Sequence, residues 1–309
     1  MRQDNDASGA SDFAGVSRRT VMLGALAAGA IVPAASSIAV AAAPLTDRGD
    51  PGAIGIPHDQ AARAAIVRRM RYRTDAGMLM WWFRGRMYAQ KGADLIPLCG
   101  MLFGSMIMLS PRDDGGFDVA QYELGFRTDW ETGRRIDRLR NPLTGEMIDI
   151  PFAPVGPTQL SYSRDNTPSV PPTLGGSKLT YDHKPEQFWT AGDTIFMQYH
   201  ARSKVETPDK PDRIINDFGM IYGSLAEALN PKVKSAKAWI QGNDVTDYAR
   251  WLKMPADAEG SQTLRSIGAK VHDFKEMPED WRAAVAEADP AMASDPLSVF
   301  SRNQAVYKG

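Results

Sequence analysis

Alternating hydrophobic and polar residues run through the middle of this chain, and this period of two is typical of half-buried β-strands. Residues 80–89 alternate in this way, as do residues 119–128, 158–164, 178–183 and 194–204. Residues 101–109 are apolar almost throughout, as in a strand buried on both faces. Turn-forming clusters rich in glycine, proline, asparagine and aspartate separate the strands. The pattern predicts an α+β protein, mainly an antiparallel β-sheet curled into a barrel or sandwich.

Helical spacing is confined to three stretches. Residues 59–73 repeat apolar positions at helical intervals, and residues 218–229 and 278–288 are also expected to be helical. Residues 166–176 are dense in proline and glycine, which predicts a long ordered loop or a mobile lid. We therefore expect the C-terminal helices to cover one opening or edge of the sheet.

The N-terminal segment has the layout of a twin-arginine export signal. Arg18 and Arg19 precede an apolar run at residues 21–32, and small residues at 39–43 suit cleavage near Ala41. The alternative is an uncleaved membrane anchor, but the apolar core of about a dozen residues is short of the ~20 that span a bilayer. We expect a signal peptide at residues 1–43, the twin-arginine export machinery as a partner, and a single mature domain at residues 44–309. That domain is expected in the periplasm, without membrane attachment.

Charge and cysteine content exclude several classes of protein. The formal net charge is -1, from 36 basic and 37 acidic residues, which argues against binding to nucleic acid. The single cysteine, Cys99, rules out an intramolecular disulfide. Its apolar surroundings favour a small buried side chain, and a nucleophile is the alternative. The sequence does not indicate an oligomeric state.

Motifs for cofactors are absent from the sequence. No glycine-rich phosphate loop opens a helix, and no Gly-x-Ser-x-Gly elbow is present, so we expect neither a nucleotide cofactor nor a serine hydrolase. The 4 histidines have no zinc-site spacing, so no metal is expected. The alternative is a site made by Asp182, His183, Glu186 and His200 if their strands were neighbours.

Several motifs resemble those of a bacterial family known as domain of unknown function 1838. They are Phe83-Arg84-Gly85-Arg86-Met87-Tyr88, Tyr122-Glu123-Leu124-Gly125-Phe126-Arg127-Thr128-Asp129, Asn141-Pro142-Leu143-Thr144-Gly145-Glu146 and Pro278-Glu279-Asp280-Trp281-Arg282. The similarity runs from about Arg71 to Pro296. Members of this family are often exported, which agrees with the signal, but the resemblance implies no activity and no catalytic residues.

The mixed faces of the strands are the remaining source of chemistry. If they line one interior, they place a few polar groups in a cavity that is otherwise apolar, which suits a small aromatic or hydrophobic molecule. It also suits proton transfer without a cofactor, as in a lyase or isomerase. We expect His200 as the base, Glu123 as an alternative base or orienting group, and Tyr162 as the acid. The expected substrate-binding residues are Arg84, Arg86 and Arg164 as anion stabilisers, together with Trp82, Tyr181 and His183.

Other interpretations remain open. Arg84 and Arg86 would equally fit a solvated sheet face, and His200 a structural role. A non-catalytic periplasmic carrier would use the same cavity to bind an apolar ligand, with polar residues that only orient it. A structural or interaction protein would have no deep pocket.

Overall fold

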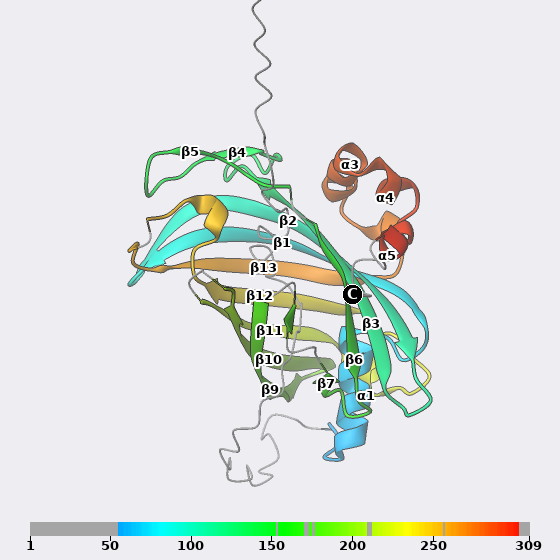
Figure 1. Ribbon diagram of the computed structural model, residues 1–309. Helices are drawn as coiled ribbons and strands as arrows, with labels where there is room; N and C mark the ends of the chain where they lie inside the picture. Colours follow the sequence, from blue (N-terminus) through cyan, green and yellow to red (C-terminus); the bar gives the residue numbers. More distant parts are fainter. Residues whose placement is uncertain are drawn as a thin grey trace, which may run out of the picture.

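The computed structural model of the protein describes residues 55–302, except residues 153, 170–172, 175–176, 209–211 and 256. About half of these residues form one antiparallel, 11-stranded sheet that is curled into a half-barrel (Figure 1). Its strands are β1 (Gly77–Lys91), β2 (Asp94–Pro111), β3 (Phe117–Thr128), β6 (Val155–Tyr162), β7 (Pro168–Ser169), β8 (Thr173–Leu174), β9 (Ser177–Ala191), β10 (Thr194–Glu206), β11 (Arg213–Ser224), β12 (Ala238–Thr246) and β13 (Ser261–Val271). The expected fold class is confirmed.

The sheet consists of two meanders that meet in its middle. The strand order is β7-β6-β3-β2-β1-β13-β12-β11-β10-β9-β8. The last strand, β13, pairs with the first, β1, from Met80↔Val271 to Gln90↔Ser261. Each half therefore forms from strands that follow one another in the chain, and a pairing between the two ends of the sequence joins the halves.

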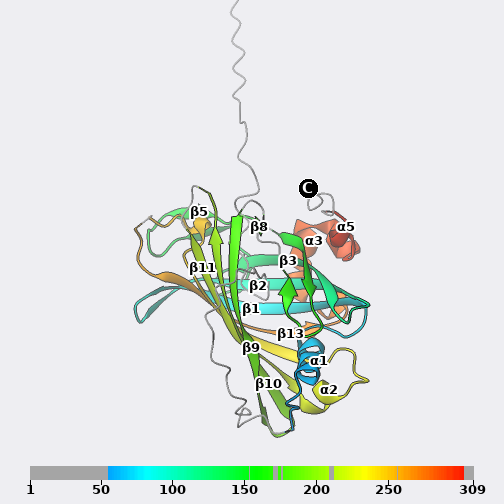
Figure 2. The same ribbon diagram turned by 60° about the horizontal axis from the view of Figure 1, so that its bottom comes forward.

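Helices and a hairpin close the two ends of the concave side. The helix α1 (Gln60–Arg71) lies beside the short helix α2 (Leu225–Leu229) at one end (Figure 2). The hairpin β4 (Arg138–Arg140) and β5 (Met147–Asp149) lies at the other end, next to the 3-10 helix η3 (Arg250–Leu252). Apolar residues from both ends and from the inner face of the sheet form one core.

A buried lysine fixes the end of α1. Lys270 on β13 donates hydrogen bonds from Nζ to the carbonyl oxygens of Arg69, Met70 and Tyr72, at 2.6, 2.8 and 3.1 Å. Within a helix the carbonyl groups of the last turn have no partners, and a cation is favourable at that end of the helix dipole. The bonds tie α1 to the middle strand of the sheet.

A second core lies on the convex face. The helices α3 (Glu279–Ala288), α4 (Pro290–Ser294) and α5 (Ser298–Arg302) follow the 3-10 helix η4 (Phe274–Glu276) and cover β2 and β3. Trp281 is fully buried there and donates from Nε1 to the carbonyl oxygen of Leu124 at 3.1 Å. The rest of the convex face is open, and Trp239 on β12 remains 45% exposed.

Helix expectations had mixed outcomes. The helices expected at residues 59–73 and 278–288 are confirmed as α1 and α3. The helix expected at residues 218–229 is wrong, because β11 continues to Ser224 and only five residues of α2 follow. Ile215 and Ile221 point inwards while Phe218 and Tyr222 point outwards, which is the alternation of a strand.

Two expectations fall partly or wholly outside the described residues. The expected signal peptide at residues 1–43 lies outside them. Within the expected loop at residues 166–176, the structure has the short strands β7 and β8. Residues 170–172 and 175–176 of this loop lie outside the described residues. Among the helices that the structure describes, none combines the length and the apolar character needed to cross a bilayer.

Candidate functional site

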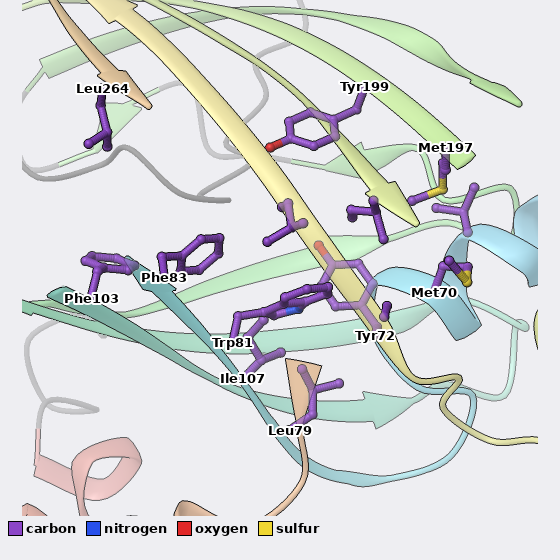
Figure 3. Packing of buried hydrophobic residues seen from close by; sticks show 14 of the residues in the cluster. Met70, Tyr72, Leu79, Trp81, Phe83, Phe103, Ile107, Met197, Tyr199 and Leu264 are labelled. Atoms are coloured by element: carbon purple, nitrogen blue, oxygen red, sulfur yellow. The ribbon is translucent and has the colours of Figure 1, made fainter. Parts of the chain in front are cut away.

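The interior of the half-barrel carries aromatic rings on one side and polar groups beside them. Figure 3 shows Trp81 and Phe83 of β1 and the nearby Tyr72 facing Tyr199 of β10. The guanidinium carbon of Arg71, at the end of α1, lies 5.0 Å from the centre of the Tyr199 ring. The apolar core therefore encloses a polar region.

A pair of carboxyl groups lies at the centre of this region. Asp217 on β11 and Asp244 on β12 are direct cross-strand partners, and each carboxyl group affects the ionisation of the other. Asp244 is 1% exposed, while Asp217 is half-buried with a shielded Oδ1. Burial raises the pKa of both carboxyl groups, and the charge of Asp217 raises that of Asp244 further. Because two adjacent carboxylates repel each other, the pair retains one proton near neutral pH.

A third buried acid, Glu123 on β3, lies within electrostatic reach of the pair. Gln121 donates from Nε2 to Glu123 Oε1 at 2.7 Å and to Ser105 Oγ at 3.1 Å. Glu123 Oε2 has no hydrogen-bond partner among the described residues. Burial raises the pKa of Glu123 to about 8, and the charge of Asp217 adds to that rise. Glu123 is therefore mostly protonated at neutral pH.

A buried ion pair balances part of this acidity. Arg71 Nη1 lies 3.3 Å from Glu186 Oε1, and His183 Nε2 lies 3.6 Å from the same oxygen. Burial opposes ionisation of Glu186, but His183 and Arg71 hold its pKa below the ordinary value. Burial lowers the pKa of the Arg71 guanidinium, but the negative charge of Glu186 raises it. The net effect is an increase in the pKa of Arg71. Arg71 is therefore a fixed positive charge in the interior.

A β-bulge brings His183 and Glu186 to the same face of β9. In a regular strand, residues three apart point to opposite faces. The pairing of β9 with β10 shifts here, because His200 faces Lys184 whereas Gln198 faces Gln187. The additional residue in β9 turns Glu186 inwards, and Pro185 suits the bulge because it has no N–H to donate.

The polar groups surround a small cavity of about 30 Å³. Its lining includes Asp217, Arg71, Tyr199, Gln121 and Ser105, together with aromatic and aliphatic side chains. This volume holds about two water molecules, since one water needs ~10–15 Å³. Unpartnered buried oxygens nearby make water or a polar ligand the natural occupant.

Four of the expected site residues point into the interior. Glu123 and His183 belong to the polar region described above, and Tyr181 stacks on His183 with ring centroids 6.0 Å apart. Tyr162 lies further along, with its hydroxyl 3.1 Å from that of Tyr72 and its ring stacked on Phe117. Burial raises the pKa of Tyr162 well above the ordinary value, so this phenol stays protonated.

The other expected site residues lie elsewhere, so the expectation that all of them line one interior is wrong. His200 is exposed on the convex face, against Phe218. Arg84 and Arg86 also point outwards and are exposed, and Trp82 is half-buried on that side. Arg164 is exposed in the turn after β6. The alternation sorted the residues of β1 correctly into two faces. The face that lines the interior is the apolar one, with Trp81 and Phe83, and the face with Arg84 and Arg86 points outwards.

Six residues of the polar region were not among those expected from the sequence. They are Arg71, Ser105, Gln121, Tyr199, Asp217 and Asp244. A usable signal existed for the acids, because Asp244 alternates in phase with the apolar Ile240, and Asp217 with Ile221. An acid in phase with the apolar residues of its strand points into the core.

The alternative metal site is not assembled. Asp182 and His200 are exposed on the outside of the sheet, whereas His183 and Glu186 are inside. Within the described part of the chain, no three histidine, cysteine or acidic side chains come together in a way that would hold a metal ion. Cys99 is buried, and burial raises the pKa of its thiol to about 11, so the thiolate of a nucleophile is disfavoured.

Comparisons with known proteins give one family and no function. None of the curated proteins matches the chain. One solved structure, a mutant of the Rh. blastica porin, shares 7% identity over 63% of this chain and 99% of its own, with a TM-score of 0.15, which carries no argument. The family model described as "Protein of unknown function (DUF1838)" matches residues 76–306. Because this match covers most of the chain, the protein belongs to the DUF1838 family.

Proposed function

We propose that this protein is an enzyme that moves protons within a small organic molecule bound inside the half-barrel, as a lyase or isomerase that needs no cofactor. The observation that carries the proposal is the contact between Asp217 and Asp244 at a buried cavity. One shared proton leaves one group as a base and the other as an acid, which is the combination that proton-transfer catalysis requires.

Asp217 is the proposed base, because it lines the cavity while Asp244 stands behind it. The Asp217 carboxylate removes a proton from a carbon next to a carbonyl group, and the C–H electron pair moves to the carbonyl oxygen as an enolate. In an isomerase, the proton returns to another carbon of the substrate. In a lyase, the electron pair of the enolate expels a leaving group from the neighbouring carbon, and this group takes up the proton.

Arg71 and Tyr199 are the proposed partners of the developing oxyanion. Both line the cavity, and Arg71 carries a positive charge that Glu186 holds in place. Burial raises the pKa of Tyr199 well above the ordinary value, so its hydroxyl remains a donor. A charge and a donor that are already oriented lower the barrier without reorganisation at the moment of reaction. Glu123, protonated at neutral pH, is a second acid for the leaving group.

The surroundings favour an enzyme over a carrier. Organic ligands usually occupy cavities of roughly 300–1,000 Å³. The cavity of about 30 Å³ must therefore enlarge before any such molecule enters. An apolar cargo would leave Oδ1 of Asp217, at the cavity wall, without a hydrogen-bond partner, at a cost of ~1–3 kcal/mol. A substrate with a carbonyl group and a largely apolar body suits both the acids and the rings of Trp81 and Phe83. We further propose that the enzyme acts in the periplasm after twin-arginine export.

Solvent exchange gives a direct test. Small molecules are extracted from the purified full chain and identified by mass spectrometry, then returned to the protein in deuterium oxide. We expect deuterium to enter the substrate at the carbon that loses a proton, and proton NMR measures this. Asp217→Asn should abolish the exchange, whereas the matched change Asp149→Asn, on the exposed strand β5, should leave it unchanged.

The result also separates the two candidate functions. A molecule that copurifies in equal molar amount, is released unchanged and takes up no deuterium would identify a carrier. Exchange that persists in Asp217→Asn would remove Asp217 as the base.

A further inference from the structure

The convex face has its own groove, on the opposite side of the sheet from the acids. Its volume is about 490 Å³, and it lies over β1, β13 and β12. Its side chains include three arginines, two amides and one exposed aliphatic residue: Arg84, Arg86, Arg265, Gln241, Asn243 and Ile267. This volume is within the range of roughly 300–1,000 Å³ that is usual for organic ligands.

Like charges face each other across this groove. Arg86 and Arg265 are direct cross-strand partners, and Arg84 lies two residues along β1 on the same face. Like charges at directly opposed strand positions destabilise a sheet. Among the described residues, one carboxylate forms an ion pair with these arginines, that of Asp280 at 2.7 Å from Arg84, so positive charge is in excess. A bound anion would remove this repulsion.

Two of the arginines are already held in place. Arg86 donates from Nη1 to the carbonyl oxygen of Trp130 at 2.6 Å, and its guanidinium carbon lies 4.3 Å from the centre of the indole ring. Trp130 in turn packs edge-on against Tyr88, with ring centroids 5.1 Å apart. Arg84 is oriented by Asp280. Side chains that are fixed before binding lose little conformational entropy when a ligand arrives.

Arg265 is the arginine of this group whose N–H donors are available to a ligand. It is exposed, and within the described residues no carboxylate forms an ion pair with it. The planar guanidinium group offers paired N–H donors that match the oxygens of a phosphate, sulfate or carboxylate group. Gln241 and Asn243 supply amides beside it, and Ile267, which is 60% exposed, supplies an apolar contact.

We propose that this groove binds a small organic oxyanion, a phosphate ester, sulfate ester or carboxylate, with Arg265 and Arg86 on its charged group. The apolar part of the ligand would lie against Ile267. The groove is separated from the interior cavity by the sheet, so this site is independent of the proposed catalytic one.

Titration calorimetry with four probes tests the site: phenyl phosphate, phenyl sulfate, benzoate and the neutral benzyl alcohol. We expect saturable binding of at least one anion and none of benzyl alcohol. Arg265→Gln should weaken the binding at least about tenfold, because a hydrogen bond to a charged group contributes ~1.5–3 kcal/mol. The matched change Arg202→Gln, on the convex face of β10, should leave it unchanged.

Each result has a defined meaning. The anion that binds most tightly identifies the charged group that the site accepts. No saturable binding of any anion, or equal affinity in wild type and Arg265→Gln, would overturn the proposal. Loss of affinity in Arg265→Gln and Arg202→Gln alike would also overturn it, because it would indicate general attraction to a basic surface. Asp217→Asn should bind the same anion normally, so failure of the proposed catalytic function would not be confused with failure here.

Discussion

Asp217 and Asp244 lie directly opposite each other on two neighbouring strands, with Glu123 as a third buried acid within electrostatic reach. Three acids at one place in a core are costly when ionised and tolerable when protonated. The interior should therefore depend on pH more strongly than the surface of the protein does.

We expect the stability of the protein to fall as pH rises from about 5 to 9. The pKa of Glu123 in the folded state, about 8, lies above its ordinary value of 4.5, so the folded state binds the proton more tightly. The contribution of Glu123 to the free energy of unfolding is complete below pH 4.5 and is lost as the pH rises past about 8. The loss is on the order of 4 kcal/mol for this group. Urea unfolding of the wild type at several pH values measures the slope.

Glu123→Gln should flatten that slope, since the amide cannot ionise. The exposed Glu131 provides the control, and Glu131→Gln should retain the slope of the wild type. If both variants follow the wild type, Glu123 is not the group responsible.

Arg71 should be difficult to replace. Arg71→Met leaves the buried carboxylate of Glu186 without its arginine, 3.3 Å away in the wild type. Breaking a buried ion pair on one side costs ~3–5 kcal/mol, whereas removing both charges costs much less. Urea unfolding should therefore show a large decrease in the free energy of unfolding for Arg71→Met. The double variant Arg71→Met/Glu186→Gln should regain part of that free energy.

The surface pair of Arg138 and Asp149 is the comparison for that experiment. Arg138→Met should change stability by less than about 1 kcal/mol, as is usual for an exposed ion pair. A double variant no more stable than Arg71→Met would show that the ion pair is not the cause.

Lys270→Met should loosen α1 from the sheet. The variant keeps most of the side-chain volume but loses all three hydrogen bonds to the carbonyl oxygens at the end of α1. The carbonyl oxygens of Arg69 and Tyr72 keep Ala236 N and Ser235 Oγ as donors, whereas that of Met70 is left without one among the described residues. We therefore expect a loss of ~1–3 kcal/mol in the free energy of unfolding. Hydrogen exchange should become faster in α1 before it changes in α3. Lys275→Met, at an exposed position, should change neither measurement.

Gly104→Ala should displace Trp281. A Cβ at this position would lie 2.4 Å from the indole, which has no room to move because the ring is fully buried. Overpacking of this kind costs ~1–3 kcal/mol. Tryptophan fluorescence and urea unfolding should both change.

Gly242→Ala is the milder counterpart of that substitution. Its Cβ would meet only the hydroxyl of Ser266, at 2.8 Å, which can rotate away. An equal loss in both glycine variants would contradict the role assigned to Trp281.

The alternation of side chains was sufficient to predict the sheet and to sort β1 into two faces. It did not identify the inner face, because Arg84 and Arg86 are compatible with a polar cavity and with solvent alike. The alternation of side chains was also insufficient where a β-bulge shifts which residues point inwards. The bulge at Pro185 places Glu186 on the same face of β9 as His183. Asp217 was missed for a different reason, since residues 218–229 were expected to form a helix.

The pairing of β1 with β13 has a consequence for how the chain matures on the ribosome. Glu123 belongs to the meander that is synthesised first, whereas Asp217 and Asp244 belong to the one synthesised last. The three acids can meet only after Val271 has emerged, because β13 joins the two meanders. A nascent chain that stalls before β13 is complete would leave the edge of β1 unpaired, with Glu123 apart from Asp217 and Asp244. Proteases that remove unfinished chains would then recognise a truncated molecule by the open edge that β13 covers in the finished one.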